Sequence, residues 1–268
     1  GFQEYIDILR AAWEVNSSRA QGARPFRVVG LNVRQEWDLL RTEKDARDPA
    51  TVQRIMSRGI PDAHMAGVIL REFGRPGSKA LVYCGAQHAL TRFRSREYER
   101  SASDMGLSET RRAGNIVFDS VGARAFTVLL HAPWPDSRSR TGLEWAAGGV
   151  IDALIAALPP DRQHAGWDTA STALGSVAIT SGSYKTGYQR LTLAELCDGY
   201  VVLGPLSAYE PATPIPGFVP PGRAADAVKN FPGLKPSPLT LEDVNKAILD
   251  DAKTVRSLLA QFRPRPPR

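Results

Sequence analysis

The sequence predicts a single α/β domain over residues 1–268, built as a mostly parallel sheet with helices on both faces. Segments with apolar residues at helical spacing alternate along the chain with short runs rich in β-branched residues. These mostly apolar runs do not alternate with polar residues, which is typical of strands buried on both faces of a parallel sheet. The alternation of the two kinds of segment favours helix layers on both sides of that sheet.

Helical periodicity is present in segments from one end of the chain to the other. In the first of them, Tyr5, Leu9 and Trp13 recur at helical spacing and predict one apolar face. In the last, Thr240 is placed as an N-cap and Asp243 falls in the first turn. Helices are therefore predicted at 2–16, 49–56, 61–73, 114–122, 148–158, 191–197 and 240–262.

Four apolar runs predict the strands of the sheet, at 27–31, 79–84, 126–130 and 200–203. Ligands of open parallel sheets collect beyond the carboxyl ends of the strands. Asn32, His88 and His131 each come at or just past the end of a predicted strand. We therefore expect these three side chains to converge on one edge of the sheet.

Three segments are predicted to be exposed or irregular. They are an Arg-rich insertion near 92–112, a Pro-rich loop at 205–222 and a basic, Pro-rich tail at 263–268. Prolines in the tail remove backbone donors, and no apolar residue follows Phe262 to anchor it. The tail is therefore expected to be disordered or draped on the surface.

Charge and composition argue against two classes of binding partner, nucleic acids and the interior of a membrane. The net charge is +6, but the basic residues are not interleaved with aromatic ones, which argues against a nucleic-acid-binding module. No apolar run approaches the ~18 residues of a membrane span.

Cys84 and Cys197 lie in apolar runs and predict buried free thiols rather than a disulfide framework. The chain begins at Gly1, so an upstream segment is expected to have been removed, while compartment and oligomeric state stay open.

Standard catalytic and metal-binding motifs are absent from the sequence. Neither His-Glu-x-x-His nor Cys-x-x-Cys occurs, and the Gly-rich phosphate loops and the Gly-x-Ser-x-Gly elbow are also missing. Ser181 and Ser183 precede Lys185 by four and two residues, which is not the Ser-x-x-Lys spacing. The histidines at predicted strand ends therefore remain as the main candidates.

His88 ends a Gly85-Ala86-Gln87-His88 step directly after the predicted strand 79–84. One interpretation is structural, with the imidazole bonded to backbone groups at a turn. The other is functional, since a neutral imidazole near pH 7 suits a general base or a metal ligand. A Gly at the strand end favours a tight turn and close approach of other groups. His131 has the same two interpretations.

The stretch "DAHMAGVILREFGRPGSKALVYCGAQHA" resembles a signature of the superfamily that joins erythromycin esterases, the haem-binding lipoprotein ChaN, the TraB proteins and the TIKI proteases. Those proteins carry a helix with Arg-Asp-x-x-Met-Ala and a strand that ends in Gly-x-x-His. The corresponding residues here are Pro61-Asp62-Ala63-His64-Met65-Ala66 and Gly85-Ala86-Gln87-His88. The resemblance extends over roughly residues 2–93.

The resemblance implies that His88 projects into a central cleft as general base or metal ligand and that Asp62 orients it. Gly85, Asn32 and His131 are then the ligand-binding candidates, and His88 is the candidate for any metal. Pro61 stands where the family has Arg, so a cation of the site is expected to be missing. The family's first strand–helix unit, with its Glu and His, is not found in this chain.

Three functions remain open at this stage. The first is an ester or amide hydrolase that activates water at His88, with or without a divalent metal. The second is a binding protein for haem or another small ligand, similar to ChaN and without turnover. The third is a degenerate domain without catalysis. The missing acidic unit separates the first from the other two, and uptake of haemin is the simplest experiment that distinguishes them.

Overall fold

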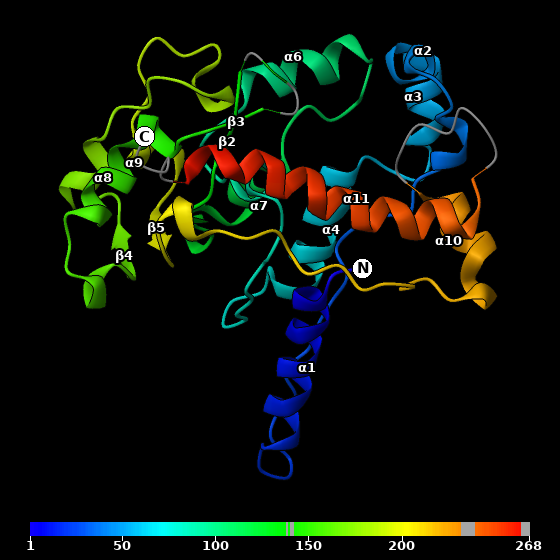
Figure 1. Cartoon of the computed structure of the whole chain (residues 1–268), viewed down its shortest axis with the longest axis horizontal. Helices are drawn as coiled ribbons and strands as arrows, with labels where there is room; N and C mark the ends of the chain where they lie inside the picture. The colour runs from blue at the N-terminus through cyan, green and yellow to red at the C-terminus, as the bar shows by residue number, and fades with distance from the viewer. Residues whose placement is uncertain (138, 140–141, 232–238, 264–268) are drawn as a thin grey trace, which may run out of the picture.

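A computed structural model of the chain describes residues 1–137, 139, 142–231 and 239–263 (Figure 1). Helices of all kinds make up 51% of these residues and strands only 8%. The described strands form one sheet of three strands and one ribbon of two. The prediction of a mostly parallel α/β sheet with helices on both faces is therefore wrong.

The larger sheet has the strand order β1-β5-β4 and is mixed. Strand β1 (Val128–Leu130) pairs in parallel with β5 (Gly199–Val202), and Leu129 lies opposite Tyr200. Strand β4 (Ala165–Asp168) pairs antiparallel with the other edge of β5. The ribbon joins β2 (Trp134–Pro135) to β3 (Leu143–Glu144).

Two of the four predicted strands do not form. The run at 126–130 contains β1 and the run at 200–203 overlaps β5, whereas those at 27–31 and 79–84 have no ladder partner in the described structure. Leu81, in the middle of the second of these, is 91% exposed. An apolar, β-branched run becomes a strand only where a neighbouring strand supplies hydrogen-bond partners, and the local sequence does not contain that information.

Most of the chain's regular structure is helical. The α-helices are α1 (Gln3–Ser17), α2 (Glu43–Arg47), α3 (Pro49–Ile55), α4 (Pro61–Phe73), α5 (Ala86–Ala89), α6 (Arg96–Asp104), α7 (Ala113–Val121), α8 (Val150–Ala156), α9 (Leu193–Leu196), α10 (Ala224–Asn230) and α11 (Leu241–Leu259). Short 3-10 turns lie at Trp37–Leu39, Gly122–Arg124, Ala146–Gly149, Pro160–Arg162, Ala173–Ser176, Ser183–Lys185, Leu206–Ala208, Pro221–Arg223 and Ala260–Phe262.

Local signals place several helix ends where the sequence predicts them. Helix α4 spans the predicted range 61–73, with Pro61 in its first turn and Gly74 at its C-cap. Helix α11 begins with a capping box, in which the Thr240 side chain accepts from the Asp243 backbone and the Asp243 carboxylate accepts from the Thr240 backbone. These predictions are confirmed.

The apolar core is divided among separate clusters. The largest packs β1 and β5 against α8 and α9 and includes Tyr200, Ile151 and Leu193. A second joins α4 to α7 through Met65 and Val117, together with smaller residues at the contact. This second contact positions the candidate site, because the two helices bring residues distant in sequence to one place.

Helix α1 projects away from the rest of the molecule (Figure 1). Its predicted apolar face is therefore left largely uncovered, and Trp13 is 68% exposed. The structure confirms the helix that this spacing predicts, because periodicity is a local property of the sequence.

The segments predicted to be exposed or irregular have different outcomes. The Arg-rich segment 92–112 contains helix α6 and ends at Arg112, whose side chain is largely buried. The loop 205–222 is irregular apart from short 3-10 turns. Residues 264–268 of the predicted tail lie outside the described residues.

Within the described residues, no helix has the length and apolar character needed to cross a bilayer.

Candidate functional site

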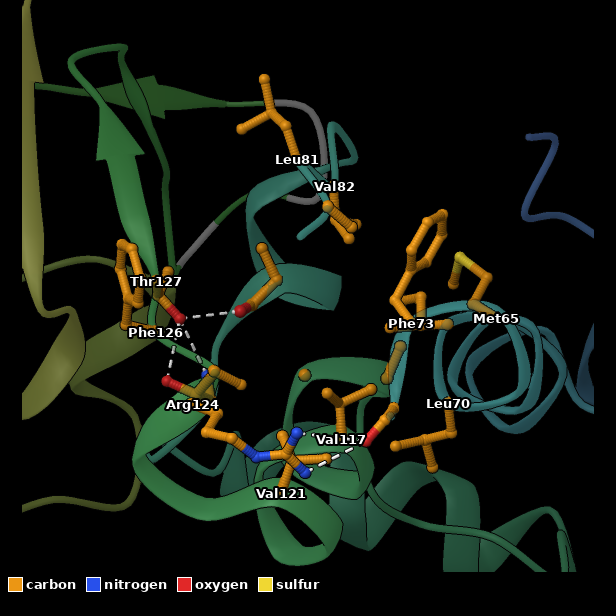
Figure 2. Close-up of a pocket in the computed structure, with 18 of the residues that line it drawn as sticks. Met65, Leu70, Phe73, Leu81, Val82, Val117, Val121, Arg124, Phe126 and Thr127 are labelled. Carbon is orange, nitrogen blue, oxygen red and sulfur yellow. Dashed lines mark hydrogen bonds between the residues drawn. The ribbon is translucent and has the colours of Figure 1, made fainter. Parts of the chain in front are cut away.

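A cavity of about 630 Å³ lies between α4, α7, the extended segment 77–84 and the beginning of β1. Figure 2 shows Met65, Phe73, Val82 and Val117 around this space. Its size lies within the range of ~300–1,000 Å³ found for small-molecule sites. Most of the lining is apolar, and His88 is among the few polar side chains that reach it.

His88 reaches the cavity from the short helix α5, not from a strand end. Gly85 is the N-cap of α5, and the backbone N–H of His88 donates to the Gly85 carbonyl at 2.9 Å. The His88 side chain is 33% exposed, and its Nδ1 lies 2.7 Å from Oδ1 of Asp62. The imidazole is thus held by a carboxylate and remains partly exposed in the lining of the cavity.

Asp62 is 2% exposed, so its carboxylate depends on protein partners for hydrogen bonds. Oδ1 accepts from the backbone N–H of Ala113 at 2.8 Å, in addition to its contact with His88. Oδ2 accepts from the guanidinium of Arg112 at 3.1 Å and from the hydroxyl of Tyr98 at 3.4 Å. Four groups from α5, α6 and the start of α7 therefore contact this one carboxylate.

The charge state of Asp62 follows from two opposing effects. Burial favours the neutral acid, but the hydrogen bond and charge of His88, the N–H of Ala113 and the charge of Arg112 outweigh it, and the pKa of Asp62 is lowered. An ionised carboxylate only accepts hydrogen bonds. His88 therefore donates from Nδ1 to Asp62, so in the neutral imidazole the lone pair is on Nε2, and no described residue bonds to that atom.

Arg112 is the principal site residue that sequence reasoning missed. Its side chain is 15% exposed; besides Asp62, it donates to Oε1 of Gln87 at 3.0 Å and lies 3.3 Å above the ring of Tyr98. Pro61 implied that a cation of the site was missing, but Arg112 supplies a cation from the start of α7. The sequence feature that could have indicated Arg112 is its position two residues before the predicted helix 114–122. It also ends the segment 92–112, which was expected to be exposed.

Tyr98 closes the polar side of the site. Burial, followed by the negative charge of Asp62, raises the pKa of Tyr98 to about 12, so the phenol keeps its proton and acts as a donor to Asp62. Tyr98 comes from α6, in the middle of the Arg-rich segment. The sequence contains no motif that connects it with Asp62.

The structure brings His88, Asp62 and Gly85 together, and it places the other two predicted ligand-binding residues elsewhere. Asn32 is exposed, and its side chain accepts from the N–H of Val33. His131 is buried: its Nδ1 lies 2.8 Å from the hydroxyl of Tyr200 and its Nε2 lies 3.3 Å from Asp152. Neither Asn32 nor His131 lines the cavity.

The expected convergence at the carboxyl edge of a parallel sheet is also corrected. The cavity borders Phe126, Thr127 and Val128, where β1 begins, whereas His131 follows the opposite end of that strand. Because the run 79–84 forms no strand, His88 is not at a sheet edge. Helices α4 and α7 position the site instead.

Cys84 also lines the cavity. Burial and then the charge of Asp62 raise the pKa of this thiol, so it is protonated near neutral pH and is not an activated nucleophile. The part of the chain that the structure describes contains no cluster of three or more His, Cys, Asp or Glu side chains placed to bind a metal ion. His88 is thus the candidate catalytic residue in the cavity lining.

The chain matches no family model, no curated protein and no solved structure. The resemblance to the TIKI superfamily therefore stays a prediction.

Proposed function

We propose that this protein is a hydrolase that cleaves an ester or amide bond by activating water at His88. The observation that carries the proposal is the His88–Asp62 pair, in which His88 also lines a cavity large enough for a small molecule. The resemblance of the Gly85–His88 step and of the Asp62 helix to the TIKI superfamily points in the same direction. No metal is needed for the steps assigned to these residues.

In the proposed reaction, His88 acts as the general base. Nε2 removes a proton from water as the water oxygen bonds to the carbonyl carbon, and the carbonyl π electrons move to its oxygen. The tetrahedral intermediate then collapses, the C–O or C–N bond breaks, and the leaving group takes the proton from Nε2. Asp62 stays ionised throughout and stabilises the imidazolium, as expected for a positioned carboxylate.

Arg112 is a positioning residue in this proposal. It contacts Asp62 through one guanidinium nitrogen and Gln87, the neighbour of His88 on α5, through another. These two bonds hold the carboxylate and the short helix relative to each other. A rigid arrangement of this kind is what general base catalysis requires, because the base must lie within hydrogen-bond reach of the water.

A matched pair of histidine variants tests the proposal. Turnover of p-nitrophenyl and anilide substrates should fall at least about 100-fold in His88→Ala, the lower range of general base contributions. His64→Ala is the control, because His64 lies exposed on α4 and should leave turnover unchanged. Thermal melts of both variants verify folding. Equal activity of His88→Ala and wild type, or absence of turnover in wild type over this substrate set, would reject a hydrolase.

Haem binding without turnover is a second candidate, favoured by an apolar cavity with an imidazole in its wall. The lining fits the chemistry of haem: apolar side chains suit the macrocycle, Lys79 and Arg124 suit its carboxylates, and His88 would be the ligand to iron. When bound, haem would supply ligand-binding or redox chemistry. Titration with haemin should then give a Soret shift that His88→Ala abolishes. If neither turnover nor haemin binding is found, a degenerate domain without catalysis is the remaining hypothesis.

A further inference from the structure

We infer that the cavity takes an amphipathic anion of the fatty acyl class, with its chain against α4 and α7 and its negative group at Lys79 and Arg124. This inference rests on the proposed function, because the scissile bond of such a substrate would have to reach His88. It goes further by naming the class of molecule that the cavity selects.

The apolar part of the lining comes from three directions. Met65, Leu70 and Phe73 come from α4, and Val117 comes from α7. The segment opposite contributes Val82, and Figure 2 shows these side chains facing a common space. An apolar chain that enters it would replace water on all of these surfaces, which is the favourable term in ligand burial.

The charged part of the lining is entirely positive. Lys79 and Arg124 line the cavity, and none of the described residues that line it is an Asp or Glu. Arg124 donates twice to the carbonyl of Gly74, at 3.1 Å from each terminal nitrogen, and Figure 2 shows its guanidinium beside the cavity. A single carbonyl leaves the other N–H groups of a guanidinium available.

Some basic residues in the described part of the chain are paired with a carboxylate and several are not, and the two that line the cavity, Lys79 and Arg124, belong to the second group. Arg92 pairs with Asp198 and Arg111 with Glu109, whereas no ion pair is found for Lys79 or Arg124 within the described structure. Unneutralised cations at the edge of an apolar cavity favour a ligand that combines a negative group with an apolar body. An apolar cavity alone would not distinguish a fatty acid from a neutral oil, but this charge pattern does.

Binding is measured in wild type, because free fatty acids and alcohols contain no ester or amide bond that the proposed reaction could cleave. Displacement of the fluorescent fatty acid cis-parinaric acid by octanoate, decanoate and dodecanoate gives the affinities. Each added methylene should tighten binding about threefold to fourfold. Dodecanol, which has the chain without the charge, should bind more weakly than dodecanoate.

Charge variants test the role of the two cations. Lys79→Gln with Arg124→Gln should weaken dodecanoate at least tenfold and leave dodecanol nearly unchanged. Lys44→Gln with Arg24→Gln removes the same net charge from exposed positions outside the cavity lining and should weaken neither. Equal losses in the two double variants would indicate general attraction to a basic protein and would overturn the assignment.

A second pair of variants tests the cavity itself. Val82→Trp fills the lining and should abolish acyl binding, whereas Tyr83→Trp, at an exposed position beside it, should not. Binding that is independent of chain length, or uptake of haemin alone without displacement by fatty acids, overturns the inference. Acyl binding in a wild type that hydrolyses no ester would contradict the proposed function only. Hydrolysis of short neutral esters without acyl binding would contradict the inference only.

Discussion

Nδ1 of His88 lies 2.7 Å from Oδ1 of Asp62, and the two residues are 26 positions apart in the chain. The same carboxylate oxygen accepts from the backbone N–H of Ala113 at the start of α7. Asp62 therefore joins α4, α5 and α7 at one buried point. A change at this carboxylate should alter both stability and chemistry, and the two effects can be measured separately.

The pH dependence of stability should show the charge of Asp62. Its pKa is lower in the folded protein than the ordinary value of 3.8, so the unfolded chain binds the proton more readily. The carboxylate's contribution is therefore fully present above about pH 4 and is lost as the pH falls through the folded pKa. Urea denaturation should show wild type more stable than Asp62→Asn at neutral pH, with the gap closing below pH 3.8. A gap that widens on acidification would contradict a lowered pKa.

Replacing Arg112 should destabilise the fold as well as the site. Arg112→Met leaves the buried Asp62 without its cation, and removal of one partner of a buried pair costs about 3 kcal/mol or more. Arg100→Met, at an exposed position on α6, is the matched control and should change the free energy of unfolding by less than about 0.5 kcal/mol. Equal midpoints of chemical denaturation for both variants would show that Asp62 does not depend on Arg112.

The contact between α7 and the end of α5 should be sensitive to a single methyl group. A Cβ at Gly114 would lie 2.5 Å from the carbonyl oxygen of Leu90 and 2.6 Å from that of Ala89, so Gly114→Ala must separate the two segments. We expect a loss of about 1–3 kcal/mol and reduced turnover, because His88 precedes Ala89 directly.

Gly67→Ala is the control for this prediction. Gly67 is exposed in the interior of α4, and a Cβ there would meet no atom within 4 Å. Alanine should therefore stabilise the helix by about 0.5–1 kcal/mol. A Gly114→Ala variant with wild-type melting temperature would contradict the close approach of α7.

The two histidines predicted to share a site should respond differently to alanine. His131 is buried and its Nδ1 lies 2.8 Å from the hydroxyl of Tyr200, so His131→Ala should cost about 2–4 kcal/mol by leaving a cavity and an unpaired hydroxyl. His88 is partly exposed, and His88→Ala should cost about 1 kcal/mol. Turnover should show the opposite order. His88→Ala should lose activity, whereas His131→Ala should stay active at temperatures below its melting temperature. Loss of activity without loss of stability in His131→Ala would assign it to the site after all.

The sequence by itself determined those features whose cause is local. Helix α4 begins at Pro61 and ends before Gly74, and α11 begins with the Thr240–Asp243 box, because caps and turns depend on residues only a few positions apart. The proximity of His88 and Asp62 was expected only through a resemblance, since no spacing rule connects a helix residue with one 26 positions later.

Only the tertiary structure decided what depends on distant partners. The runs 27–31 and 79–84 have the composition of strands, but strand formation requires a neighbour, and the described structure provides none. Arg112 belongs to a segment whose composition predicts exposure, yet its guanidinium is largely buried because Asp62 and Gln87 accept its hydrogen bonds. His131 follows a strand as predicted, and packing against Tyr200 makes it part of the interior. In each case the energy comes from contacts between residues far apart in sequence, which local patterns do not encode.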